Sequence, residues 1–195
     1  AVITRSVFSH LVGSDSVQFD AFTRRQIETF EQVSQEIQDA FSHKILRHIC
    51  NTAGIGRYPG AQFDMVRLGI GLYGVDPFTN EILHNVSTLK TTILQIRDVP
   101  QEDSVGYSRK GRLERDSRIA AIPIGYADGL NRHLGNGKGY CLVNGKKAPY
   151  VGNICMDVCM IDVTGIECKE GDTVEIFGPQ LPVTTVADWL ETIPY

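Results

Sequence analysis

The first part of the chain combines short apolar runs with one long amphipathic segment. Apolar side chains recur every three to five positions among polar ones, at Phe19, Phe22, Ile27, Phe30, Val33, Ile37 and Phe41. This spacing is close to the 3.6-residue period and predicts a helix of about six turns. Apolar runs at 7–12, 45–51 and 65–73 predict buried strands, and a Gly- and Pro-rich stretch covers residues 54–60. Strand, long helix and strand in this order predict βα units with parallel strands.

The pattern changes after Gly74, where residues 75–78 read as a linker. From Ser87 onward the apolar runs are short, rich in β-branched residues and bounded by turns, at 89–99, 118–124, 140–143, 147–151, 159–163 and 173–177. Asn144-Gly145 accepts the positive φ angles of a type I′ turn and predicts a hairpin. Residues 185–191 predict a short helix, stopped before Pro194. The second part is therefore expected to be a mostly antiparallel β-domain.

Composition narrows the class of protein. The chain has 195 residues, 42% hydrophobic and 22% charged, which fits one large or two small globular domains. Its net charge of −4 argues against a nucleic-acid partner. No apolar run approaches the ~18 residues of a membrane span. The first residues lack a signal-peptide pattern, and the five cysteines show no Cys-x-x-Cys spacing, so we expect a reduced, cytoplasmic compartment and no metal site. The missing initiator methionine leads us to read the chain as a piece of a longer protein.

The first part carries candidate binding residues near the ends of its predicted strands. Thr52 offers a hydroxyl and Gly69 a closely approachable amide, which suits a phosphate, although glycines here also fit simple turns. Arg67 stands among apolar neighbours and needs a partner, either in a structural ion pair or at an acceptor nitrogen of a ligand. His10 and His48 lie in predicted strands, where they are either core residues or members of a hydrogen-bond relay.

The second part carries a tyrosine in the motif Gly-Tyr-Ser-Arg at 106–109. A phenol with a reference pKa near ~10 is a poor base unless cations or hydrogen bonds favour its ionised form. From the residues alone, Tyr107 is either a surface side chain or a proton carrier. Two further motifs follow, Gly-Tyr-Ala-Asp-Gly at 125–129 and Cys-Met-Asp at 155–157.

Taken in order, these motifs resemble those of alanine racemases that depend on pyridoxal phosphate and have fold type III. The resemblance rests on His48-x-x-Asn51-Thr52-Ala53-Gly54, on Arg67-x-Gly-Ile-x-x-Tyr-Gly, and on the motifs at 106–109, 125–129 and 152–157. It implies an α/β plus β architecture: the last three βα units of a TIM (β/α)8 barrel in residues 1–76, then the β-domain in residues 77–195. It also implies a bacterial enzyme that interconverts L- and D-alanine and supplies D-alanine for peptidoglycan.

The resemblance implies a cofactor site in the first part. Arg67 would hydrogen-bond the pyridine nitrogen of pyridoxal phosphate. The amides of Gly69 and Ile70 would bind the phosphate, assisted by the hydroxyl of Thr52, where the family usually has serine. His48 would support Arg67 from behind.

The resemblance implies a catalytic role in the second part. Tyr107 would exchange the α-proton on the face of L-alanine, supported by His10. Tyr126 would narrow the substrate entrance, Arg132 would lie beside it, and the amide of Met156 would reach the substrate carboxylate. Tyr107, Tyr126 and Met156 would complete the active site of a partner subunit, which implies a homodimer with two composite sites.

The chain departs from the family pattern in two informative ways. Asn153 stands where the family usually has arginine. The Lys-Ala-Asn-Ala-Tyr-Gly-like motif that carries the cofactor-binding lysine is missing, so we expect this chain to lack the N-terminal half of the barrel and to be inactive alone. Two alternatives stay open: a broader racemase that also accepts serine, and a non-catalytic dimerisation module of a fused cell-wall enzyme.

Overall fold

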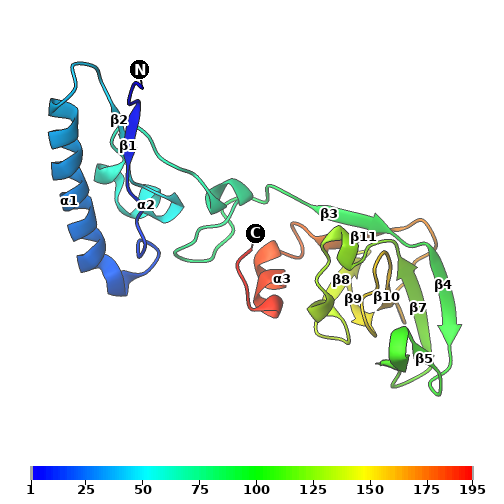
Figure 1. Ribbon diagram of the computed structural model, residues 1–195. Helices are drawn as coiled ribbons and strands as arrows, with labels where there is room; N and C mark the ends of the chain where they lie inside the picture. Colours follow the sequence, from blue (N-terminus) through cyan, green and yellow to red (C-terminus); the bar gives the residue numbers. More distant parts are fainter. Residues whose placement is uncertain (1, 195) are drawn as a thin grey trace. The chain divides into compact units, whose positions relative to one another are not determined.

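Two hydrophobic cores, one in each half of the chain, organise the fold. The computed structural model describes residues 2–194, and its backbone divides into two compact units, one extending to Val86 and the other beginning at Ser87 (Figure 1). The first core comprises Leu11, Phe30, Ile49, Cys50 and Ala61. The second is larger and lies within the β-sheet unit.

The first unit is built on two parallel strands and one long helix. Strand β1 (Ser6–Phe8) pairs in parallel with β2 (Leu46–His48), so that Phe8 lies opposite His48. The helix α1 (Asp20–Asp39) connects them after a 3₁₀ turn, η1 (Val17–Phe19), and its Phe30 is buried in the core. The amphipathic helix and the parallel pairing are confirmed (Figure 1). Both strands are shorter than predicted, and the carbonyls that follow them, those of Ser9, His10 and Ile49, accept side-chain donors.

The glycine- and proline-rich stretch after β2 is largely helical. Helix α2 (Thr52–Arg57) begins at Asn51, whose Oδ1 accepts the amide of Gly54 at 3.0 Å. A side-chain acceptor at this position satisfies one of the free amides of a helix N-terminus, which offsets the poor helix propensity of glycine. A 3₁₀ turn, η2 (Pro59–Ala61), follows at the proline.

The third strand predicted at 65–73 does not form. Only the amides of Asp64 and Arg67 donate to the β2 side, to Arg47 O at 3.1 Å and Cys50 O at 3.0 Å. Donors three residues apart do not fit a parallel ladder, in which alternate residues bond the neighbouring strand. Residues 70–73 instead form the 3₁₀ turn η3 (Ile70–Tyr73), in which Leu72 is 61% exposed. The apolar run that predicted a buried strand is thus largely at the surface of this unit.

The second unit is a curled antiparallel sheet of seven strands in the order β3-β11-β8-β9-β10-β7-β4 (Figure 1). The strands are β3 (Leu89–Thr92), β4 (Gln95–Val99), β7 (Ser117–Ile122), β8 (Tyr140–Val143), β9 (Lys146–Val151), β10 (Cys159–Asp162) and β11 (Thr173–Phe177). The predicted mostly antiparallel β-domain is confirmed, with every strand within a few residues of its predicted place except the first.

The predicted strand at 89–99 is two strands separated by a bend. β3 pairs with β11, whereas β4 pairs with β7 at the other end of the sheet. At the bend Ile93 is 2% exposed and its amide donates to Asp172 O, while the amide of Leu94 donates to Ala121 O. The buried isoleucine anchors the bend in the core, so this one stretch of chain joins the two ends of the sheet.

Turns in the second unit follow the local sequence. Asn144 and Gly145 have φ angles of 50° and 74°, as a type I′ turn requires, and Val143 pairs with Lys146, so the predicted hairpin is confirmed. The last helix, α3 (Val183–Leu190), starts two residues earlier than predicted and ends at Glu191, which is left-handed. The connecting 3₁₀ turns are η4 (Tyr107–Arg109), η5 (Tyr126–Asp128) and η6 (Arg132–Leu134).

A small hairpin formed by β5 (Ser104–Val105) and β6 (Gly111–Arg112) packs on the backbone after β9. Gly152 has φ 68°, and a Cβ added there would lie 2.8 Å from Val105 O and 3.2 Å from Gly111 N. No side chain fits this contact. Glycine at 152 therefore lets the hairpin backbone approach closely.

We expect Gly152→Ala to destabilise the second unit more than Gly165→Ala. Both glycines are left-handed, with φ 68° and 74°, but a Cβ at Gly165 would meet nothing within 4 Å. Gly165→Ala should therefore lower the free energy of unfolding only through the strain of alanine at a positive φ, by roughly 1–2 kcal/mol. Gly152→Ala should lower it by about 1–3 kcal/mol more, because the added Cβ overlaps backbone atoms. Urea unfolding of the two variants measures the difference, and equal losses would contradict this packing.

Candidate functional site

A guanidinium at the C-terminal ends of β1 and β2 is the centre of the candidate site in the first unit. Arg67 Nη2 donates to Ser9 O at 2.7 Å and to Ile49 O at 3.3 Å, and Nη1 donates to His48 O at 3.3 Å. The two Nη atoms also lie 2.6 Å from His48 Nδ1 and 3.2 Å from His10 Nδ1. These five acceptors come from the ends of both strands, so the side chain of Arg67 ties the strands together where their ladder stops.

The arginine fixes the state of the imidazole beside it. A guanidinium stays protonated and only donates, so Nδ1 of His48 accepts and the proton of the neutral ring lies on Nε2. His48 is 6% exposed, and its ring stacks on that of Phe8 at 5.4 Å between centroids. Burial first, and the charge of Arg67 second, lower the pKa of His48 below its usual range. His48 is therefore held as a neutral acceptor.

Arg67 is not part of an ion pair. Within residues 2–194 no carboxylate lies within 4.0 Å of it, and its acceptors are three carbonyls and two imidazoles. Its Nε is the one guanidinium nitrogen for which the described chain provides no acceptor. Of the two interpretations from the sequence, the structural ion pair is wrong. The geometry leaves a cationic N–H donor without a partner at the strand ends.

A hydroxyl and glycine amides cluster a few residues farther along the chain. Thr52 Oγ1 accepts the amides of Gly69 at 3.1 Å and Gly71 at 3.2 Å. Since the oxygen accepts both bonds, the hydroxyl hydrogen is left to donate outward. Gly69 is exposed and Ile70 half-buried, so this segment faces accessible space in the first unit. The role of Thr52, Gly69 and Ile70 in binding a phosphate stays a prediction. In this structure the amide of Gly69 donates to Thr52 Oγ1.

In the second unit, Tyr107 lies at the tip of the β5–β6 hairpin and is 73% exposed. Gly106 before it has φ 78°, and a Cβ there would lie 3.9 Å from the amide nitrogen of Asn153. The hairpin tip therefore sits beside the start of the segment 152–156.

The same segment positions the other two predicted residues. The amide of Tyr126 donates to Cys155 O at 3.0 Å, and that of Ala127 donates to Met156 O at 3.0 Å. A Cβ at Gly125 would lie 2.2 Å from Met156 O, so only glycine admits this approach. Tyr126 is 45% and Met156 56% exposed, unlike the core strands around them. Two large side chains are thus exposed on two adjoining loops whose backbones bond each other.

Arg132 and Asn136 complete the surroundings of this segment. The guanidinium carbon of Arg132 lies 5.5 Å from the centre of the Tyr126 ring, a cation–π distance. The amide of Asn136 donates to Gly152 O at 2.8 Å, and its side-chain Nδ2 donates to Asn153 Oδ1 at 3.1 Å. Asn136 is the residue that sequence reasoning missed. The sequence Gly135-Asn136-Gly137 indicates a turn but not its partner.

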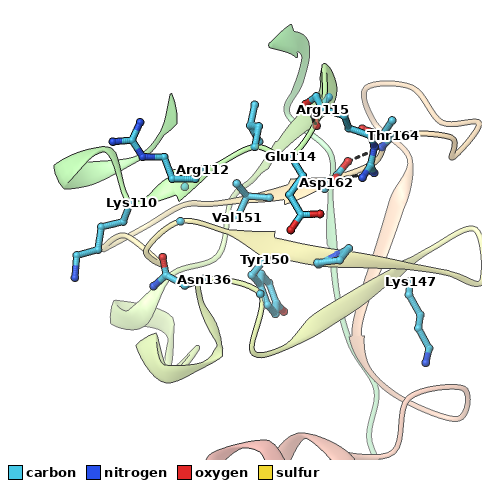
Figure 2. A pocket seen from close by; sticks show the side chains of 16 residues that line it. Lys110, Arg112, Glu114, Arg115, Asn136, Lys147, Tyr150, Val151, Asp162 and Thr164 are labelled. Carbon is cyan, nitrogen blue, oxygen red and sulfur yellow. Dashed lines mark hydrogen bonds and ion pairs between the residues drawn. The ribbon is translucent and has the colours of Figure 1, made fainter. Parts of the chain in front are cut away.

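A groove of about 680 Å³ runs beside β6 and β9 (Figure 2). Four of its lining residues are cationic, namely Lys110, Arg112, Arg115 and Lys147. Figure 2 shows the ends of Lys110 and Lys147 far apart and pointing away from each other, while Arg115 bonds Asp162 at 3.2 Å. Lys110 and Lys147 do not converge and Arg115 is paired, so the groove shows no cluster of cations around one point.

The predicted residues therefore form two clusters, and each cluster lies within one unit. The first cluster lies at the strand ends of the first unit and comprises Arg67, His48, His10, Thr52, Gly69 and Ile70. The second lies at the segment 152–156 of the second unit and comprises Met156 in that segment with Tyr107, Tyr126 and Arg132 around it. Residues 2–194 contain no group of three or more His, Cys, Asp or Glu that could hold a metal ion. None of the helices described is long and apolar enough to cross a membrane. All five cysteines are free thiols.

We expect His48 to make the complete protein less stable as the pH falls. Its pKa is lowered in the fold, so below about 6.5 the unfolded chain takes up a proton that folded His48 refuses. The free energy of unfolding should fall with decreasing pH until the folded pKa is passed, with a slope of at most about 1.4 kcal/mol per pH unit. Urea unfolding between pH 7.5 and 5 should show a shallower slope for His48→Asn, which keeps an acceptor for Arg67. The exposed His133, changed to Asn, is the control. An unchanged slope in His48→Asn would contradict the neutral histidine.

Comparisons with known proteins agree along the whole chain. The family model of the alanine racemase N-terminal domain matches residues 1–77, and that of the C-terminal domain matches residues 86–195. Alanine racemase 2 of Caldanaerobacter subterraneus subsp. tengcongensis is 41% identical over 97% of this chain and 50% of its own length. Alanine racemase 1 of Oceanobacillus iheyensis is 37% identical over 97% of this chain and 53% of its own length.

A solved structure gives the same result. The crystal structure of alanine racemase from Bartonella henselae with covalently bound pyridoxal phosphate is similar to 97% of this chain and 52% of its own, with a TM-score of 0.84 and 34% identity. The chain spans about half the length of the curated relatives it matches. With both family models matched and these identities, the chain belongs to the alanine racemase family.

Proposed function

We propose that the protein containing this chain racemises alanine with pyridoxal phosphate, in the cytoplasm of a bacterium that uses the D-alanine for peptidoglycan. The observation that carries this proposal is the unpaired guanidinium N–H of Arg67 at the strand ends, in a chain of the alanine racemase family. The names of the relatives support alanine as the substrate. In this proposal residues 1–76 are the last three βα units of a barrel, although residues 65–73 form no strand in this chain.

The residues present fit pyridoxal phosphate. The group needs a donor for its ring nitrogen and several donors for its phosphate. Arg67 offers Nε–H, and Thr52 offers a hydroxyl hydrogen beside the segment of Gly69 and Ile70. When bound, the cofactor withdraws electrons from the substrate α-carbon and acidifies its proton.

Arg67 sets the electronic state of the ring nitrogen. A permanently charged guanidinium disfavours a second positive charge beside it, so the nitrogen would accept a hydrogen bond instead of a proton. His48 and three carbonyls hold both Nη atoms, which fixes the direction of Nε. The ring is then a weaker electron sink than with a carboxylate partner. That suits an enzyme whose task is to move one proton off and onto a carbon.

Tyr107 would move that proton on one face of the substrate. Racemisation needs an acid–base group on each face, one donating where the other has abstracted. The family resemblance assigns the second group to a lysine that this chain lacks. Tyr107 is 73% exposed in its own unit, as are Tyr126 at 45% and Met156 at 56%. Three exposed side chains on or beside the segment 152–156 suit a surface that completes the site of a partner subunit, so we include a homodimer in the proposal.

We expect Tyr107→Phe in the complete protein to lower kcat for L-alanine by about 10²–10⁴-fold while the bound cofactor stays stoichiometric. Racemisation followed by circular dichroism measures the first, and cofactor absorbance measures the second. Tyr140→Phe is the matched control, because it removes a phenol hydroxyl from a half-buried ring of the same unit that packs on Trp189. Full activity of Tyr107→Phe would refute the proposed mechanism and favour a non-catalytic module. Equal turnover of alanine and serine would point to a broader racemase.

A further inference from the structure

The loop that carries Tyr107 is held in an unfavourable backbone conformation. Ser108 and Arg109 have φ angles of 58° and 52°, two consecutive non-glycine residues in the left-handed region. Residues other than glycine visit this region singly and at a cost, so a tandem persists only where its surroundings impose it. No other pair of adjacent non-glycine residues in the described part of the chain has this conformation.

One side-chain bond crosses this loop. Arg109 Nε donates to Ser104 Oγ at 2.8 Å, from the end of the loop to the first residue of β5. The remaining bonds of the loop are short-range backbone bonds, from the amide of Arg109 to Gly106 O at 3.2 Å and from that of Lys110 to Tyr107 O at 3.4 Å. The strands on either side contribute only two residue pairs. Among the described residues, the Ser104–Arg109 bond is therefore the side-chain hydrogen bond that closes the loop around Tyr107, in addition to the two strand pairs of the hairpin.

We propose that Ser104 and Arg109 are positioning residues for Tyr107: their hydrogen bond holds the left-handed tandem and so fixes the direction of the phenol. This inference rests on the proposed function, because it assigns the bond a purpose through the proton transfer of Tyr107. The bond lies among exposed residues, so its loss leaves the sheet intact and changes the loop. Proton transfer depends on the distance and alignment between the phenol and the substrate atom. A small displacement of the phenol therefore lowers the rate of proton transfer.

The proposal predicts a kinetic change and a change in loop dynamics. In the complete, cofactor-loaded protein, Ser104→Ala should lower kcat for L-alanine about tenfold with KM within about twofold. The isotope effect of α-deuterated L-alanine should rise, because abstraction by Tyr107 becomes slower than the other steps. Amide hydrogen exchange of residues 106–110, followed by mass spectrometry, should become about tenfold faster. Ser104→Thr keeps the hydroxyl and should restore all three values.

The matched control is Arg115→Gln, which breaks an exposed arginine bond of 3.2 Å to Asp162 outside the loop and should change none of these readouts. Arg109→Gln removes the donor of the same bond and is measured by the same three readouts. If Ser104→Ala does not fold, Arg109→Gln alone tests the proposal. The double variant Ser104→Ala/Arg109→Gln should be no worse than either single variant.

Two outcomes would overturn the proposal: unchanged exchange of residues 106–110 in both single variants, or losses of rate that multiply in the double variant. Tyr107→Phe separates this failure from that of the proposed function. Loss of racemisation in Tyr107→Phe with no effect in Ser104→Ala rejects the positioning role alone. Full activity in Tyr107→Phe rejects the mechanism itself.

Discussion

A guanidinium without a carboxylate partner determines the form of the first unit. Arg67 collects carbonyls from the ends of both parallel strands, and the ladder between those strands stops where its Nη atoms begin. The segment before it lies along β2 with only two amide bonds, because its arginine takes up the carbonyls that a further strand would use. Burial first, and the same charge second, lower the pKa of His48 and favour its neutral form. One side chain thus ends the sheet, orients an imidazole and retains a single free donor.

The second unit positions its residues by a different means, with backbone instead of side-chain contacts. Two surrounding loops approach the segment 152–156 at Gly125 and Gly135, where an added Cβ would lie within 3 Å of the segment's backbone atoms, and the β5–β6 hairpin approaches it at Gly152. These contacts involve backbone carbonyls and amides. The exposed side chains of the segment and its neighbours are therefore not needed to hold the segment in place. Tyr107, Tyr126 and Met156 are therefore available for chemistry outside their own unit.

The sequence predicted the elements whose pattern is local. The long helix, the Asn144-Gly145 hairpin and the antiparallel strands each carry their signal within a few residues. The strand predicted at 65–73 failed because hydrophobicity reports which residues avoid water but not which carbonyls are available to pair. The bend at Ile93 was missed for the same reason, since a strand that pairs with two different neighbours has the same apolar pattern as a straight one. The candidate site residues were inferred from the family resemblance, whereas the carbonyls that Arg67 bonds, those of Ser9, His48 and Ile49, have no sequence signature.

The departure at Asn153 follows from the way the second unit is built. The family usually has arginine at this position. If the side chain at 153 were what holds the segment in place, a short neutral residue could not replace that arginine. Here the segment is held by Gly152 O, Cys155 O and Met156 O, which accept the amides of Asn136, Tyr126 and Ala127. The side chain of Asn153 contributes only one further bond, to Asn136. A change of charge at 153 therefore leaves the backbone of Met156 in position and alters only the electrostatics around it.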